Sequence, residues 1–192
     1  DQILEPFGGE VFDMSTGETS RFAAFWGTTA LIGSITALYL QRKVSMMNYA
    51  RINRWGIYLL VSTFVLLTVT AFTELEAMLR PTLILFGAGL GMWNIGAWGL
   101  MVSVSSDKRV GTYFGLWTMA SLLFRGGGQV LGAAIRDITV FLTNTEALAY
   151  AIVFALEAGI LVLALVIVNR IHFEEHIDDA THEQVLVAVG TE

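Results

Sequence analysis

Long apolar stretches alternate with short polar segments along most of the chain. The apolar stretches cover residues 22–40, 55–72, 81–104, 110–135 and 148–168. At about 1.5 Å per residue, an α-helix of each length crosses the roughly 30 Å hydrocarbon core of a bilayer. Helices that are apolar on nearly every side do not suit a soluble core. The pattern therefore predicts an all-α polytopic membrane protein with five transmembrane helices.

Residues 1–20 are less apolar than the five stretches. Pro6 and the pair Gly8 and Gly9 predict a broken helix, because proline lacks the backbone N–H that a helix interior needs. We interpret this segment as the end of a truncated span followed by an external turn. Pro81 opens the third apolar stretch, where the first helical turn tolerates proline.

The charged residues predict the orientation in the membrane. Charged residues make up 15% of the chain, against about 25% for soluble domains. Seven basic residues lie on one side of the five stretches: Arg42, Lys43, Arg51, Arg54, Lys108, Arg109 and Arg170. The other side has three, which are Arg21, Arg80 and Arg136. The positive-inside rule makes the former side cytoplasmic. We therefore expect a bundle over 21–170 and a polar cytoplasmic tail over 171–192, in a bacterial inner membrane.

Composition excludes several kinds of chemistry. The chain has no cysteine, so disulfides, thiol catalysis and cysteine-based metal sites are ruled out. His172, His176 and His182 all fall in the tail, and we expect no metal site there. No basic block suggests nucleic acid, and no catalytic motif is present. We therefore expect a protein that is not an enzyme.

Arg125 is the most informative single residue, because it lies well inside the fourth apolar stretch. A guanidinium in the membrane costs at least about 2.5 kcal/mol unless it is paired or hydrated. We expect it to face a cavity or a carboxylate, with Glu157, Glu5 and Glu10 as candidates. Both an ion pair that fixes helix packing and a substrate or coupling site fit this pattern.

Other polar residues extend the candidate site. Glu5 and Glu10 flank the predicted helix break, where a carboxylate can bind a cation, a proton or a pigment magnesium; ordinary solvated acids are the alternative. Asn94 and Gln129 lie inside apolar stretches. Each could form a hydrogen bond that supports helix packing, which is the commoner case, or could act as a weak ligand. Glycines cluster in the third and fourth stretches, which favours close packing of helices. The functional alternative is that they act as hinges or leave room for a flat ligand.

Several short motifs occur in order along the chain. The longest runs Leu4-Glu5-Pro6-Phe7-Gly8-Gly9-Glu10-Val11-Phe12 and continues through Met14-Ser15 and Gly17-Glu18-Thr19. Shorter motifs are Ala24-Phe25-Trp26-Gly27, Gly111-Thr112-Tyr113-Phe114-Gly115-Leu116-Trp117, Arg125-Gly126, Leu148-Ala149-Tyr150 and Val153-Phe154. Together they resemble the PucC family, the bacteriochlorophyll delivery branch of the major facilitator superfamily. The chain departs from the family pattern at Phe7, where tyrosine is usual, at Asp13, where glycine is usual, and at Gly127-Gly128, which lengthens a glycine run.

The resemblance implies the C-terminal six-helix half of a major-facilitator-type fold, with its first helix truncated. It also implies an assembly factor for light-harvesting complexes that handles or delivers (bacterio)chlorophyll as a transient ligand. The implied partners are lipid, pigment, light-harvesting polypeptides, reaction-centre complexes and the missing N-terminal half. Glu5 and Glu10 would bind pigment magnesium or a coupling proton, and Arg125 would pair with them or with the pigment. The alternatives are a subunit retained in a photosynthetic supercomplex and a proton-coupled transporter of a small solute.

Overall fold

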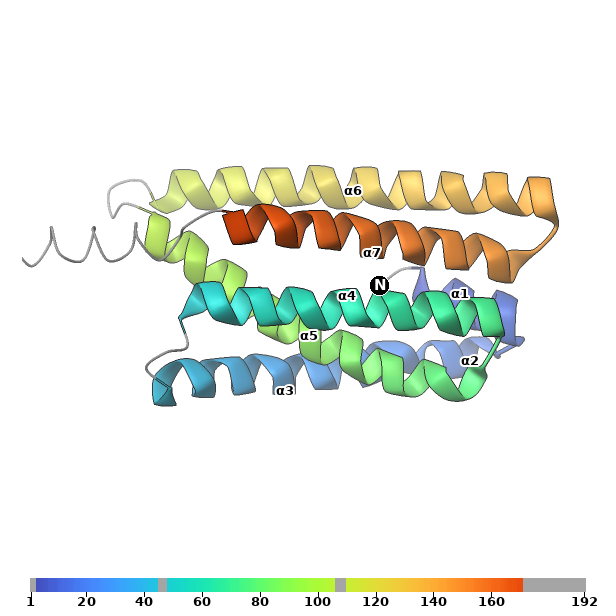
Figure 1. Ribbon diagram of the computed structural model, residues 1–192, viewed down its shortest axis with the longest axis horizontal. Coiled ribbons are helices and arrows are strands. Elements are labelled where there is room, and N and C mark those ends of the chain that lie inside the picture. The colour runs from blue at the N-terminus through green and yellow to red at the C-terminus, as the bar shows by residue number, and fades with distance from the viewer. Residues whose placement is uncertain (1–2, 45–47, 106–109, 171–192) are drawn as a thin grey trace, which may run out of the picture.

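The computed structural model describes residues 3–44, 48–105 and 110–170, and this part of the chain consists of helices joined by short turns (Figure 1). Its helices are α1 (Leu4–Phe12), α2 (Thr16–Thr19), α3 (Arg21–Lys43), α4 (Tyr49–Thr73), α5 (Glu76–Val104), α6 (Val110–Thr143) and α7 (Glu146–Arg170). The predicted tail and the loop residues Lys108 and Arg109 lie outside the described residues.

The five long helices run alternately up and down, so their ends gather at two opposite ends of the bundle (Figure 1). The end with the α6–α7 connection, here the acidic end, carries Glu10, Asp13, Glu18, Glu74, Glu76, Asp137 and Glu146. The opposite end, here the basic end, carries Arg42, Lys43, Arg51, Arg54 and Arg170. The charge asymmetry expected from the sequence is therefore present in the fold.

Four helical segments of the described chain are long and apolar enough to cross a membrane. They are Thr16–Lys43, Tyr49–Thr73, Glu76–Ser103 and Glu146–Arg170. The fifth expected span is helical, and α6 is the longest helix at 34 residues, but it is not among these four. Its glycines and its polar residues, including Arg125 and Gln129, lower its hydropathy. That α6 also crosses the membrane stays a prediction.

Two expectations about proline were wrong. Helix α1 continues through Pro6 and the glycine pair, because Pro6 is the third helical residue and no intrahelical bond to its nitrogen is needed there. Helix α5 begins at Glu76, five residues before Pro81, so Pro81 lies inside the helix rather than at its start. The acidic residue in the first turn favours this earlier start, since a carboxylate complements the positive helix N-terminus.

Glycines of α5 bring its backbone against both neighbouring helices. A Cβ added at Gly91 would lie 2.0 Å from the Ala30 carbonyl oxygen of α3. One added at Gly96 would lie 2.5 Å from the backbone of Asn53 on α4. The Ser34 hydroxyl also donates to the Gly91 carbonyl at 3.3 Å. The close packing expected of these glycines is therefore what holds α3, α4 and α5 together.

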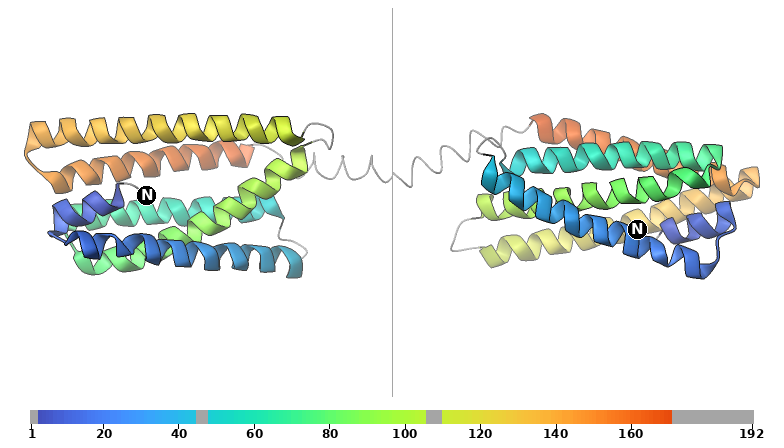
Figure 2. Two further views of the ribbon diagram at one scale, coloured as in Figure 1. Left: turned by 180° about the vertical axis from the view of Figure 1, so that it is seen from behind. Right: turned by 90° about the horizontal axis from the view of Figure 1, so that it is seen from below.

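Helix α6 has no buried residue. Every side chain from residue 115 to residue 131 is exposed, and a Cβ at Gly126, Gly127 or Gly128 would meet no atom within 4 Å. Along Figure 1 α6 runs beside α7, but the view from below in Figure 2 shows the two converging at the acidic end and separating toward the other. The glycines of α6 thus make no packing contacts comparable to those of α5.

Candidate functional site

Helix α1 is held by an aromatic cluster at the acidic end. Leu4, Phe7 and Gly8 form its buried face. The Phe7 ring lies 5.1 Å from that of Tyr150 and 5.0 Å from that of Phe154, centroid to centroid. The contact with Phe154 is edge-on and that with Tyr150 is tilted, and aromatic pairs of this kind are favourable beyond their burial alone. The α1 backbone is thereby fixed against α7.

Gly8 allows α1 to approach the start of α3. An added Cβ at this position would lie 2.6 Å from the Phe22 ring and 2.9 Å from the Thr19 methyl group. The first glycine of the motif is therefore required by packing. Gly9, by contrast, would place a Cβ no closer than 3.8 Å to its nearest neighbour, the Met14 carbonyl.

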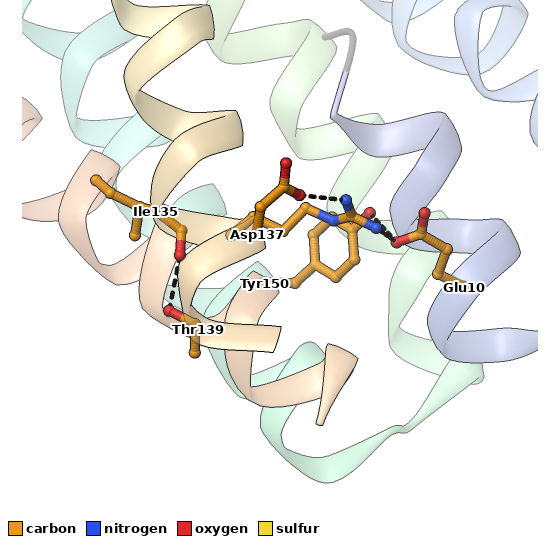
Figure 3. Close-up of polar contacts among 6 residues, drawn as sticks. Glu10, Ile135, Asp137, Thr139 and Tyr150 are labelled. Carbon is orange, nitrogen blue, oxygen red and sulfur yellow. Dashed lines mark hydrogen bonds and ion pairs between the residues drawn. The ribbon is translucent and has the colours of Figure 1, made fainter. Parts of the chain in front are cut away.

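Glu10 leaves α1 toward two other helices (Figure 3). Its carboxylate pairs with the Arg136 guanidinium of α6 and accepts a hydrogen bond from the Tyr150 hydroxyl of α7 at 2.7 Å. Arg136 also pairs with Asp137 at 2.7 Å and lies over the Tyr150 ring, 5.4 Å from its centroid. The Arg136 and Glu10 side chains retain 25% and 34% of their exposure. One carboxylate therefore ties three helices together at a partly solvated position.

The cluster continues into a stripe of residues between α6 and α7. Arg125, Gln129, Gly132 and Arg136 are spaced four, three and four residues apart, so they share one face of α6. On α7, Tyr150, Val153 and Glu157 share a face for the same reason. We call these two stripes together the α6–α7 seam.

Contacts at the acidic end set the register of the seam. Arg136 lies over Tyr150, and a Cβ at Gly132 would lie 3.9 Å from Val153. Because the helices are antiparallel, the next residues along the seam are Gln129 on α6 and Glu157 on α7. Gln129 is exposed and Glu157 is half-buried. The seam is therefore closed at Gly132 and opens away from the acidic end.

The structure separates some residues that were predicted together. Glu10 pairs with Arg136, which lies eleven residues, or about 16 Å, along α6 from Arg125. Glu10, one of the three carboxylates considered for Arg125, therefore pairs with a different arginine. Glu5 is five residues before Glu10, which places the two carboxylates about 140° apart around α1.

Asn94 lies away from the seam. It follows Gly87 by seven residues and Gly91 by three, and both glycines face α3. Arg125, Gln129 and Glu157 therefore share one seam, whereas Asn94 belongs to the contact between α5 and α3.

Similarity to known proteins bears on this geometry, because the residues of the cluster fall inside the matched region. The model of the family described as PUCC protein matches residues 1–176. The chain belongs to the PucC family. It is an integral membrane protein with at least the four candidate spans described above.

Individual PucC relatives are distant and longer. Protein PucC of Cereibacter sphaeroides is 28% identical over 173 residues, which are 88% of this chain and 37% of the relative. The "Bacteriochlorophyll synthase 44.5 kDa chain" of Rhodobacter capsulatus is 28% identical over 167 residues, which are 84% of this chain and 38% of that protein. The chain thus spans little more than a third of these relatives. No solved structure matches it significantly.

Arg136, Asp137 and Tyr150 were not predicted as site residues. In the sequence, Arg136 was considered only in the distribution of charges between the two sides of the membrane, and Tyr150 only as part of a motif that resembles the PucC family. A usable signal was the spacing of Arg136 from Arg125, which places both on one face of a helix. No sequence spacing identifies Glu10 as the partner, since 126 residues separate it from Arg136.

Proposed function

We propose that this chain is part of a membrane carrier or chaperone that handles (bacterio)chlorophyll while light-harvesting complexes assemble. The observation that carries the proposal is PucC family membership across residues 1–176. The names of relatives add a photosynthetic context: one is called PucC and another a bacteriochlorophyll synthase chain. The proposed role is movement or handover of pigment, with no bond made or broken by the chain itself.

The residues at hand fit such a pigment as cargo. Chlorophyll-type molecules offer a magnesium ion, carbonyl groups and a flat apolar ring. Glu5 is exposed on α1 and makes no hydrogen bond or ion pair within the described residues, so its carboxylate is a suitable magnesium ligand. Glu10 already pairs with Arg136 and Tyr150. We therefore assign magnesium binding to Glu5 and the positioning of α1 to Glu10.

The α6–α7 seam supplies the remaining contacts that we propose. Arg125 and Gln129 present donors to pigment carbonyl groups where the seam is open. Gly126 and Gly128 leave the surface flat beside these side chains. A planar ring with polar substituents matches this combination.

The proposal extends to the longer protein of which this chain would be a part. Since the chain covers only 37–38% of these two relatives, we propose that it represents the C-terminal six-helix half of a major-facilitator-type fold. The exposed stretch of α6 from residue 118 to residue 131 then faces the other half of the protein. A cavity between the halves would have the α6–α7 seam and α1 in one wall.

Replacing the two carboxylates in the full-length protein tests these assignments. Glu5→Gln should reduce the pigment that co-purifies with the protein while leaving its thermal stability unchanged. Glu10→Gln should lower the stability, because Arg136 loses its partner on α1. Glu74→Gln, at an exposed glutamate of the same end, is the matched control and should change neither quantity.

Antenna accumulation in cells carrying these variants separates the alternatives. The proposal predicts less antenna with Glu5→Gln although pigment synthesis continues. Stable stoichiometric retention of the protein in mature photosynthetic complexes would instead favour a resident subunit. Normal antenna together with proton-dependent uptake of a small solute would favour an ordinary transporter and overturn the proposal.

A further inference from the structure

Exposed tryptophan and tyrosine side chains occur in only one half of the bundle. Among the described residues, those with strongly exposed rings are Tyr39, Trp55, Tyr58, Trp98, Tyr113 and Trp117. We call these six the aromatic girdle. They come from four helices, α3, α4, α5 and α6, and each lies nearer to the helix terminus at the basic end than to the other terminus. At the acidic end the described tryptophan and tyrosine rings are covered to a greater degree, as for Trp26 and Tyr150.

The girdle occupies a narrow depth in the bundle. Its members lie three to nine residues from the helix terminus at the basic end. At the α-helical rise this is about 5–14 Å from the end. The strongly exposed rings near the acidic end, such as Phe72 and Phe141, carry no polar atom. A band of rings with polar tips at one depth is typical of side chains at the boundary between lipid headgroups and hydrocarbon.

Basic side chains lie immediately beyond the girdle. Arg42 and Lys43 close α3, Arg170 closes α7, and all three are exposed. No carboxylate occurs in the last turn of either helix. The acidic end carries exposed carboxylates, such as Glu74 and Glu146, beside its exposed cations Arg21 and Arg80. Rings with polar tips followed by exposed cations fit a lipid whose headgroup is negatively charged.

We propose that the basic end with its aromatic girdle is a binding surface for anionic phospholipid. The rings hold the glycerol and upper acyl region, and Arg42, Lys43 and Arg170 bind the headgroup phosphates. Charge complementarity selects this occupant over a neutral lipid. The surface is independent of the α6–α7 seam and of the pigment role proposed above.

Quenching of tryptophan fluorescence by brominated lipid tests the proposal. The full-length protein that carries this chain is placed in nanodiscs of phosphatidylcholine and phosphatidylglycerol, with bromine on the tails of one lipid at a time. Brominated phosphatidylglycerol should quench more strongly than brominated phosphatidylcholine at equal mole fraction. Trp55→Phe and Trp98→Phe should each remove part of this quenching, which identifies the girdle as its origin.

Paired charge variants make the outcome decisive. A basic side chain near an anionic surface changes affinity by about fivefold, so Arg42→Gln with Lys43→Gln should lower the preference for phosphatidylglycerol by about 25-fold. Arg21→Gln with Arg80→Gln removes two cations at the acidic end and should leave the preference unchanged. Equal quenching by both lipids in the unaltered protein would overturn the proposal. So would girdle tryptophans that neither lipid quenches, since another part of the protein would then cover them.

Discussion

Replacement of Gly91 by alanine measures how far the close approach of α3 and α5 stabilises the bundle. The added Cβ would lie 2.0 Å from the Ala30 carbonyl oxygen and 2.8 Å from the Ser34 nitrogen. Both neighbours are backbone atoms, so relief requires the two helices to move apart by more than about 1 Å, which costs about 1–3 kcal/mol. Separation also weakens the hydrogen bond from the Ser34 hydroxyl to the Gly91 carbonyl, worth about 1 kcal/mol.

Alanine also gains about 1 kcal/mol over glycine from helix propensity, so the net destabilisation should be about 2 kcal/mol. Gly27→Ala is the matched control, because a Cβ there meets nothing within 4 Å and should stabilise α3 by up to about 1 kcal/mol. Unfolding of the full-length protein in mixed micelles, followed by circular dichroism, gives both values. Equal stability of the two variants would refute the claim that α5 glycines hold the helices together.

Two further substitutions test the acidic end. Tyr150→Phe keeps the buried ring but removes its hydroxyl bond to Glu10, so the free energy of unfolding should fall by about 1.5 kcal/mol, as measured in the same assay. The same loss in a Glu10→Ala background, where the acceptor is gone, would show that this bond is not the cause. Asp13 ends α1 with φ 52°, in the left-handed region where the PucC-like motif usually has glycine. Asp13→Gly should therefore raise the free energy of unfolding by about 1 kcal/mol, whereas Met14→Gly, at a neighbour whose φ is not positive, should not.

The sequence predicts most of the helical framework because membrane helices are specified by local composition. A run of about 20 apolar residues has few other stable arrangements in a bilayer, so each of the five expected stretches is helical in the structure. Helix ends are less well specified. Glu76 and Arg80 are polar yet helical, so hydropathy places the start of α5 too late, at Pro81.

The candidate site is harder to predict because its contacts join distant parts of the chain. Glu10 is separated by 126 residues from Arg136 and by 140 from Tyr150. Local pattern singled out Arg125, whose position deep in an apolar stretch suggests a high desolvation cost, and it assigned Arg136 to a helix end. The packing of Phe7 on α7 decides which arginine Glu10 meets, and that contact depends on tertiary structure.

Helices α5 and α6 have similar glycine content, but only the glycines of α5 pack closely against neighbouring helices. Both helices are rich in glycine, and both were expected to pack closely. In α5 the glycines face carbonyl and amide atoms of α3 and α4 at distances that exclude any side chain. In α6, Gly111, Gly115 and the run Gly126–Gly128 face open space. Glycine content therefore specifies only that a helix surface is narrow and flat, and a neighbouring structure is needed for close packing.

Two partners could cover the glycines of α6. One is another part of a longer protein, since the relatives are more than twice as long as the matched region. The other is a planar ligand at the open end of the α6–α7 seam. The second partner requires polar residues beside the glycines, and Arg125 and Gln129 meet that requirement on α6. For the pigment role proposed above, we therefore place the ligand at the open end of the seam and not on the outer face of the helix.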